Sequence, residues 1–152
     1  MSVLTHQVID HNAAQTGQKI RKALRAAFPS VKFSLRMARG TGHGWFDLSW
    51  TDGPTEDDVQ EIIAPFRSSY FDSTDDSTRS IEPTMYMDDH GQLTEYRYTC
   101  RGVLTQRHLS DEAVAQMDAY IEAHGGDAAI NHTGIEGRDI TRGVLARSWR
   151  FA

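Results

Sequence analysis

The clearest alternation of apolar and polar positions in the chain lies around a run of glycines. In V-K-F-S-L-R-M, residues 31–37, every second position is apolar, and W-F-D-L-S-W, residues 45–50, repeats the pattern. A period of two is typical of a strand with one buried and one wet face. The glycine-rich segment 40–44 separates the two runs and can supply the positive φ angles of a turn. The pattern therefore predicts an antiparallel hairpin.

Three stretches have the apolar period of a helix. Residues 13–28 carry one apolar stripe and stop at Pro29. Residues 55–66 begin with T-E-D-D, which resembles a capping box with acids in the first turn. A third helix is expected from Ser110, a good N-cap, to the glycines at Gly125.

The other segments have weaker patterns. Residues 67–80 are polar and predict a loop. Residues 84–87 and 94–104 predict a second hairpin, whose second strand is long and turns into a bulge near its glycine. Residues 127–141 predict a loop, whereas residues 143–151 fit either a closing strand or a short helix.

This order of elements predicts an α+β fold. Short connections favour antiparallel pairing, and three amphipathic helices can cover one face of a sheet. We therefore expect a two-layer sandwich, with an antiparallel sheet of four or five strands from two hairpins and three helices mainly on one face. At 152 residues the chain is expected to form one domain. Residues 99–152 would complete it.

Composition restricts the expected cellular compartment and the possible partners of the chain. The single cysteine, Cys100, excludes an internal disulfide. The chain has no apolar run of membrane-spanning length and no basic N-terminus followed by an apolar run. We therefore expect a cytoplasmic protein that does not contact membranes.

Charge is separated along the chain. Residues 12–46 carry seven basic residues and no acid, whereas residues 47–95 carry 13 acids against two arginines, a net −11. Such asymmetry fits a surface that imitates nucleic acid, a surface that binds it, or neighbouring elements that neutralise each other. The candidate acidic surface consists of Asp57, Asp58, Asp72, Asp75 and Asp76. The alternative basic surface consists of Lys19, Lys22, Arg25, Lys32, Arg36 and Arg39.

One aromatic residue of the first hairpin points away from the others. Trp45 lies on the face opposite Phe46 and Trp50 in a strand. If the helices cover those two, Trp45 stands on the open side of the sheet as a candidate anchor for a partner. The alternative is that Trp149 and Phe151 of the C-terminal segment cover it.

Catalytic and metal-binding patterns are weak. None of the histidines forms a metal-ligand pair, the aspartates of residues 72–76 lack the order of an EF-hand, and the glycine run joins two strands rather than a strand and a helix. Cys100 is more simply a buried strand residue than a nucleophile paired with His90 or His108. We expect no metal, no cofactor and no enzymatic activity.

Three segments carry a family resemblance: I-R-K-A-L-R-A-A-F-P-S-V-K-F-S-L-R, D-L-S-W-T-D-G-P-T-E-D-D-V and F-R-S-S-Y-F-D-S-T-D-D-S. Over residues 20–98 the chain resembles the large polyvalent protein-associated domain 29, a module of phage and conjugative-element proteins. The resemblance implies a mobile genetic element and work against host defence or on incoming DNA. It assigns no catalytic residue.

These observations lead to two functional hypotheses. The first is a non-enzymatic inhibitor or modulator of host defence, of the anti-restriction or anti-CRISPR type, that contacts a host defence or DNA-processing protein through its acidic surface. The alternative is an accessory protein that binds nucleic acid through the basic first helix and hairpin.

Overall fold

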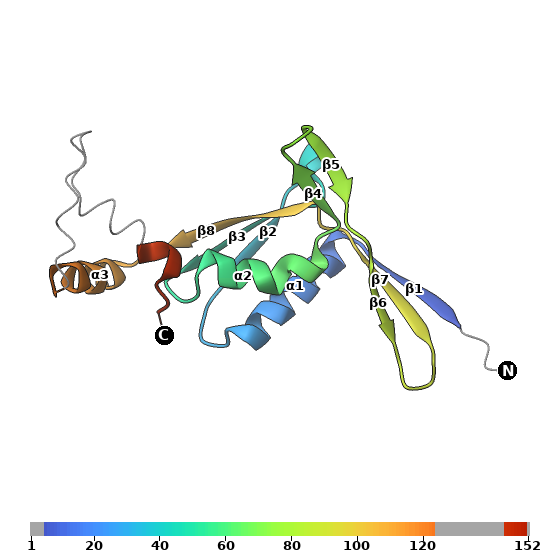
Figure 1. The fold of residues 1–152 in the computed structure, drawn as a ribbon, viewed down its shortest axis with the longest axis horizontal. Coiled ribbons are helices and arrows are strands. Elements are labelled where there is room, and N and C mark those ends of the chain that lie inside the picture. The colour runs from blue at the N-terminus through green and yellow to red at the C-terminus, as the bar shows by residue number, and fades with distance from the viewer. Residues whose placement is uncertain (1–4, 124–144, 152) are drawn as a thin grey trace.

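The computed structural model describes residues 5–123 and 145–151. Its elements, labelled in Figure 1 where there is room, are β1 (His6–His11), α1 (Ala13–Ala27), β2 (Ser34–Met37), η1 (Gly40–Gly42), β3 (Trp45–Thr51), α2 (Glu56–Ile63), η2 (Ala64–Phe66), β4 (Ser69–Asp72), β5 (Ser77–Ser80), β6 (Thr84–Met87), β7 (Leu93–Tyr98), β8 (Gly102–His108) and α3 (Asp111–Ala123). The fold is mixed α+β, as predicted.

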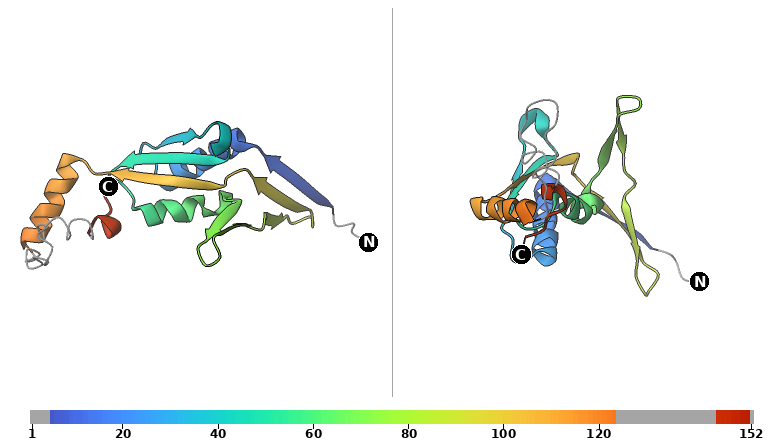
Figure 2. Two further views of the ribbon diagram at one scale, coloured as in Figure 1. Left: turned by 90° about the horizontal axis from the view of Figure 1, so that it is seen from above. Right: turned by 60° about the vertical axis from the view of Figure 1, so that its left-hand side comes forward.

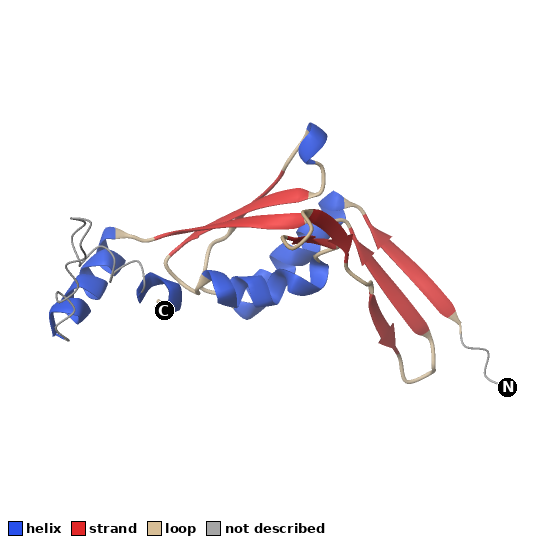
Figure 3. Ribbon diagram, turned by 45° about the horizontal axis from the view of Figure 1, so that its top comes forward, coloured by secondary structure: helices blue, strands red, loops and turns tan. Residues whose placement is uncertain are grey.

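Strand β3 is the centre of the sheet β2–β3–β8 and of the core. Its residues Phe46, Leu48 and Trp50 are buried, and α1 and α2 lie on this side of the sheet (Figure 3). The helices contribute Ile20, Leu24, Val59 and Ile63 to the same apolar cluster. The first predicted hairpin is confirmed, because β2 and β3 pair antiparallel. Its first strand begins at Ser34 rather than at residue 31.

The expected single antiparallel sheet is not found. The described strands form three sheets, and β8 lies parallel to β3. The predicted strand 94–104 is divided between β7 and β8 at Cys100. The cause is a set of bonds to Ser68: its backbone N–H and hydroxyl donate to the Cys100 carbonyl at 2.7 and 2.8 Å, and the Cys100 N–H donates back to the hydroxyl at 3.3 Å. These bonds hold the chain where it passes from one sheet to the other.

The second sheet, β1–β7–β6, extends away from the body toward the N-terminus (Figures 1 and 2). The predicted β6–β7 hairpin is confirmed, with Gly91 at φ 76° in its turn. Strand β1, which pairs parallel to β7, has no counterpart in the sequence predictions.

The loop predicted for residues 67–80 is instead the hairpin β4–β5. Asp76 adopts φ 57° between the strands, a conformation that aspartate tolerates in turns. Arg79 donates to Asp75 at 2.8 Å and lies 3.2 Å from Asp72. These bonds order a segment whose composition alone indicates a loop.

Helix α3 is confirmed, but it lies beyond the end of the sheet rather than on the face covered by α1 and α2 (Figure 1). Its buried residues Ala113, Met117 and Ile121 do not belong to the cluster around β3. Residues 145–148 are helical, so the short-helix alternative holds for the described part of the last segment. The loop predicted for residues 127–141 lies outside the described residues. No helix in the described part has the length and apolarity needed to cross a bilayer.

Candidate functional site

Within the described residues, the face of the β2–β3–β8 sheet opposite α1 and α2 carries no helix (Figure 3). In the observed register, Arg36, Asp47 and Leu104 form one row across the three strands, and Leu104 is 59% exposed. A shallow depression of about 750 Å³ lies over this region. We call the following residues the open face: Ser34, Arg36, Trp45, Asp47, Ser49, Leu104 and Gln106.

Trp45 has a fixed place on the open face. It pairs in register with Gly102 of β8, and a Cβ atom at position 102 would clash with the indole ring. The indole therefore lies directly against the glycine backbone, a close approach that a side chain would prevent. Trp45 remains 36% exposed. A large aromatic side chain held in one position loses little conformational freedom when a partner covers it.

The C-terminal aromatics lie elsewhere. Trp149 packs edge-on against Tyr120 at 5.1 Å, and the Phe151 ring lies 5.3 Å from the guanidinium of Arg107. Arg107 pairs in register with Trp50, so it belongs to the helix side of β8. The alternative in which Trp149 and Phe151 cover Trp45 is therefore not what the structure shows.

The five predicted acidic residues are divided between two places. Asp57 and Asp58 lie in the first turn of α2, whereas Asp72, Asp75 and Asp76 lie in the β4–β5 hairpin, beyond the other end of α2 (Figure 1). Asp72 and Asp75 pair with Arg79. Asp57 and Asp76 form no ion pair with another described residue. The five predicted acidic residues thus form two small groups, in which Asp58, Asp72 and Asp75 have an arginine partner.

The predicted basic residues also fall on two sides. Lys19, Lys22 and Arg25 occupy the exposed side of α1, whereas Arg36 lies on the open face behind the sheet. Lys32 and Arg39 lie in the connections on either side of β2. Among the described residues, none of these six cations forms an ion pair. The structure therefore leaves them available, but not on one continuous surface.

A polar network that the sequence did not reveal joins the C-terminal segment to the end of the sheet. Arg107 donates to the carbonyls of Asp52 at 3.0 Å, Gly53 at 2.8 Å and Ala146 at 2.7 Å, and to that of Trp149 at 2.5 Å. Burial lowers the pKa of Arg107, which remains charged at neutral pH. The guanidinium of Arg107 thus has four carbonyl acceptors, and its role is structural.

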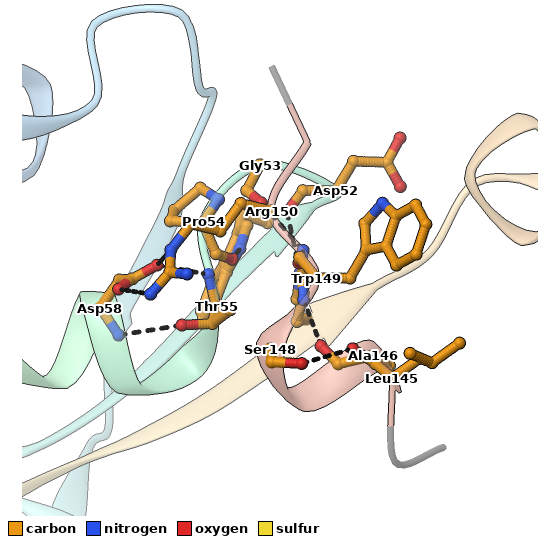
Figure 4. A network of polar contacts seen from close by, with 12 residues as sticks. Asp52, Gly53, Pro54, Thr55, Asp58, Leu145, Ala146, Ser148, Trp149 and Arg150 are labelled. Atoms are coloured by element: carbon orange, nitrogen blue, oxygen red, sulfur yellow. Dashed lines mark hydrogen bonds and ion pairs between the residues drawn. The ribbon is translucent and has the colours of Figure 1, made fainter. Parts of the chain in front are cut away.

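Asp58 carries the second link in this network. It caps α2 together with Thr55, and its carboxylate accepts two bonds from Arg150 at 2.8 and 2.9 Å (Figure 4). The bonds from Arg150 and Thr55 lower the pKa of Asp58 from 3.8 to about 2, against the opposing effect of burial. The carboxylate of Asp58 is therefore already bound to other groups of the same chain.

Cys100 does not have the environment of a nucleophile. It is fully buried, and burial raises the pKa of its thiol to about 11, although the charge of Arg67 acts in the opposite direction. The thiol is therefore protonated at neutral pH, as expected for a small buried apolar residue. In the part of the chain that the structure describes, no three His, Cys, Asp or Glu side chains gather as a metal site.

The described residues form a small α+β module with an open sheet face. The sequence model of the large polyvalent protein associated domain 29 family matches residues 11–110, and the chain belongs to this family. The match confirms the resemblance and extends it beyond residues 20–98 in both directions. It ends at the residue before α3. Comparisons with curated proteins and with solved structures found no match.

The low pKa of Asp58 predicts a pH-dependent contribution to stability. The pKa of Asp58 is lower in the folded chain than in the unfolded chain, where it is near 3.8. The ionised carboxylate therefore stabilises the fold at pH values above 3.8, and this stabilisation disappears as the pH falls toward 2. Asp58→Asn should therefore cost about 1 kcal/mol or less at pH 7, because Arg150 is solvent-exposed. The difference from wild type should shrink below pH 4 in urea titrations. Asp57→Asn is the matched control, and an equal, pH-independent loss in both variants would contradict the assignment.

Proposed function

We propose that this chain is a non-enzymatic protein-binding module of a mobile-element protein, and that it binds its partner through the open face. Membership of the polyvalent-protein-associated family fits such an origin. The observation that carries the proposal is Trp45, a partly exposed indole held against Gly102 on a sheet face without helix cover in the described structure. Tryptophan is enriched among residues that dominate binding energy.

The surroundings of Trp45 suit a protein partner. Leu104 adds exposed apolar surface, while Arg36 and Asp47 supply one charge of each sign in the same row. An apolar centre with polar and charged neighbours is typical of protein interfaces. One charge of each sign can orient a protein partner, and it does not favour a ligand of uniform charge.

The partner class that we propose is a host defence or DNA-processing protein, which the chain inhibits or modulates. The net charge of −11 in residues 47–95 supports a nucleic-acid-like contribution. Of the five predicted acids, Asp57 and Asp76 are best able to provide it, since Asp58, Asp72 and Asp75 have partners within the chain. Acidic contact is then an addition to the aromatic anchor rather than a substitute for it.

Replacing the anchor should remove binding. Pull-down from host extract with Trp45→Ala should recover at least about 10-fold less of each specific partner than wild type, the usual consequence of removing a hot-spot aromatic. Phe71→Ala is the matched control, because Phe71 is 60% exposed but lies on β4. Undiminished recovery with Trp45→Ala would contradict binding through the open face. If a double Asp57→Asn, Asp76→Asn variant recovers as much partner as wild type, the proposed acidic contribution is wrong, but binding through the open face is not.

Binding of nucleic acid is the second candidate, favoured by the six cations that lack ion-pair partners among the described residues. It predicts affinity for duplex or single strands that falls steeply between about 50 and 200 mM salt, because neutralised phosphates release counterions. Fluorescence anisotropy should then show weaker binding and a smaller salt slope for a Lys19→Ala, Lys22→Ala, Arg25→Ala variant. Absence of binding at low salt would eliminate this candidate.

A further inference from the structure

Strand β6 is an edge strand without charge. It lies at one edge of the sheet β1–β7–β6, which extends away from the body (Figures 1 and 2). Charged side chains on an edge strand prevent it from pairing with another chain. The other described edge strands, β1, β2, β4, β5 and β8, each carry one: Asp10, Arg36, Asp72, Arg79 and Arg107. Strand β6, with the sequence T-M-Y-M, has no such protection.

The side chains of β6 are apolar and exposed. Met85, Tyr86 and Met87 are 49%, 60% and 55% exposed. Successive side chains alternate across a strand, so the two methionines lie on one face of the sheet and the tyrosine lies on the other. Both faces of this edge therefore offer apolar surface to a partner.

The hydrogen bonds of the β6–β7 hairpin show which backbone groups of β6 face outward. The Asp88 N–H donates to the Gln92 carbonyl at 3.0 Å, so these opposite residues form a hydrogen-bonded pair. Bonded and non-bonded pairs alternate along an antiparallel ladder, which makes Met87 and Leu93 a non-bonded pair. Accordingly, the Leu93 N–H donates to the segment that leads into β1, also at 3.0 Å. The N–H and carbonyl groups of Met87, and of Met85 two residues before it, therefore point to the free edge.

We propose that β6 is a site of self-association, where it pairs antiparallel with β6 of a second copy and joins the two three-stranded sheets into one. The sequence around Tyr86 reads the same in both directions, M-Y-M. A two-fold axis at Tyr86 therefore sets Met85 of each copy opposite Met87 of the other, and the two tyrosines against each other. Each methionine pair then exchanges both of its backbone hydrogen bonds. Addition of a strand to an exposed sheet edge is a recurring mode of protein recognition.

The residues around β6 favour a second copy in this register. Asp88, the charged residue nearest to the strand, faces Thr84 rather than another acid, and its carboxylate already accepts bonds from the backbone of its own turn. A shift of two residues in one direction sets Met87 opposite Pro83, which has no N–H to donate, and in the other direction sets Met85 opposite the hairpin turn. The inference does not depend on binding through the open face, because β6 and the open face belong to different sheets.

Self-association of the full chain tests the proposal. One short strand gives a small interface, so sedimentation equilibrium should show a monomer at about 10 µM and a rising share of dimer toward about 1 mM. Met85→Lys combined with Met87→Lys should raise the dissociation constant at least about 10-fold, because the new positive charges of the two copies face each other. Val8→Lys is the matched control, since Val8 is also exposed but lies on β1 at the opposite edge of the same sheet. A wild-type chain that stays monomeric, or equal dimerisation of wild type and the double variant, would overturn the proposal.

A thiol at the two-fold axis tests the register directly. Tyr86→Cys should form a disulfide between copies under mild oxidation, because the Cα atoms of a non-bonded antiparallel pair lie about 4.5 Å apart, within disulfide reach. Tyr86 is exposed, so the variant should fold as wild type does, and the native thiol of Cys100 is fully buried and does not compete. Val8→Cys is the matched control and should cross-link much more slowly. Equal rates of cross-linking in the two variants would contradict pairing through β6.

Discussion

Burial of alternate residues of β3 under α1 and α2 is the interaction on which the structure depends. Phe46, Leu48 and Trp50 form the floor of the core, and Gly17 lets α1 approach so closely that an added Cβ would lie 3.1 Å from the Phe46 ring. Because side chains alternate across a strand, the same residues that bury one face leave Trp45 and its neighbours on the other. The core and the proposed binding surface are thus two consequences of one register.

The helices and hairpins that local sequence patterns determine were predicted correctly. The first hairpin, α1, α2 with its Thr55–Asp58 capping box, the β6–β7 hairpin and α3 were all expected. The pairing of β1 with β7 and of β3 with β8 was not, because parallel partners lie far apart in the chain and leave no local signal. The β4–β5 hairpin was missed because the bonds of Arg79 to Asp72 and Asp75 order a segment with the composition of a loop.

The candidate sites likewise include features that the sequence predicted and features that it did not. Period-two alternation placed Trp45 opposite the core, and this orientation is observed. Charge counting could not show that Asp58 is bound by Arg150, 92 residues away, or that α2 separates the two acidic groups. Arg107 carried no signal either, because the carbonyl acceptors that surround it come together only in the folded chain.

The division of β3 into a buried and an open face is tested most directly by the free energies of unfolding of Trp50→Ala and Trp45→Ala in urea. Trp50 is 2% exposed and donates to the Pro54 carbonyl at 3.0 Å, so its truncation should cost about 3–5 kcal/mol. Trp45 is 36% exposed, and its loss should cost clearly less, about 1–2 kcal/mol, because part of the indole is already in solvent. Similar losses in the two variants would contradict an open sheet face and the binding role assigned to it.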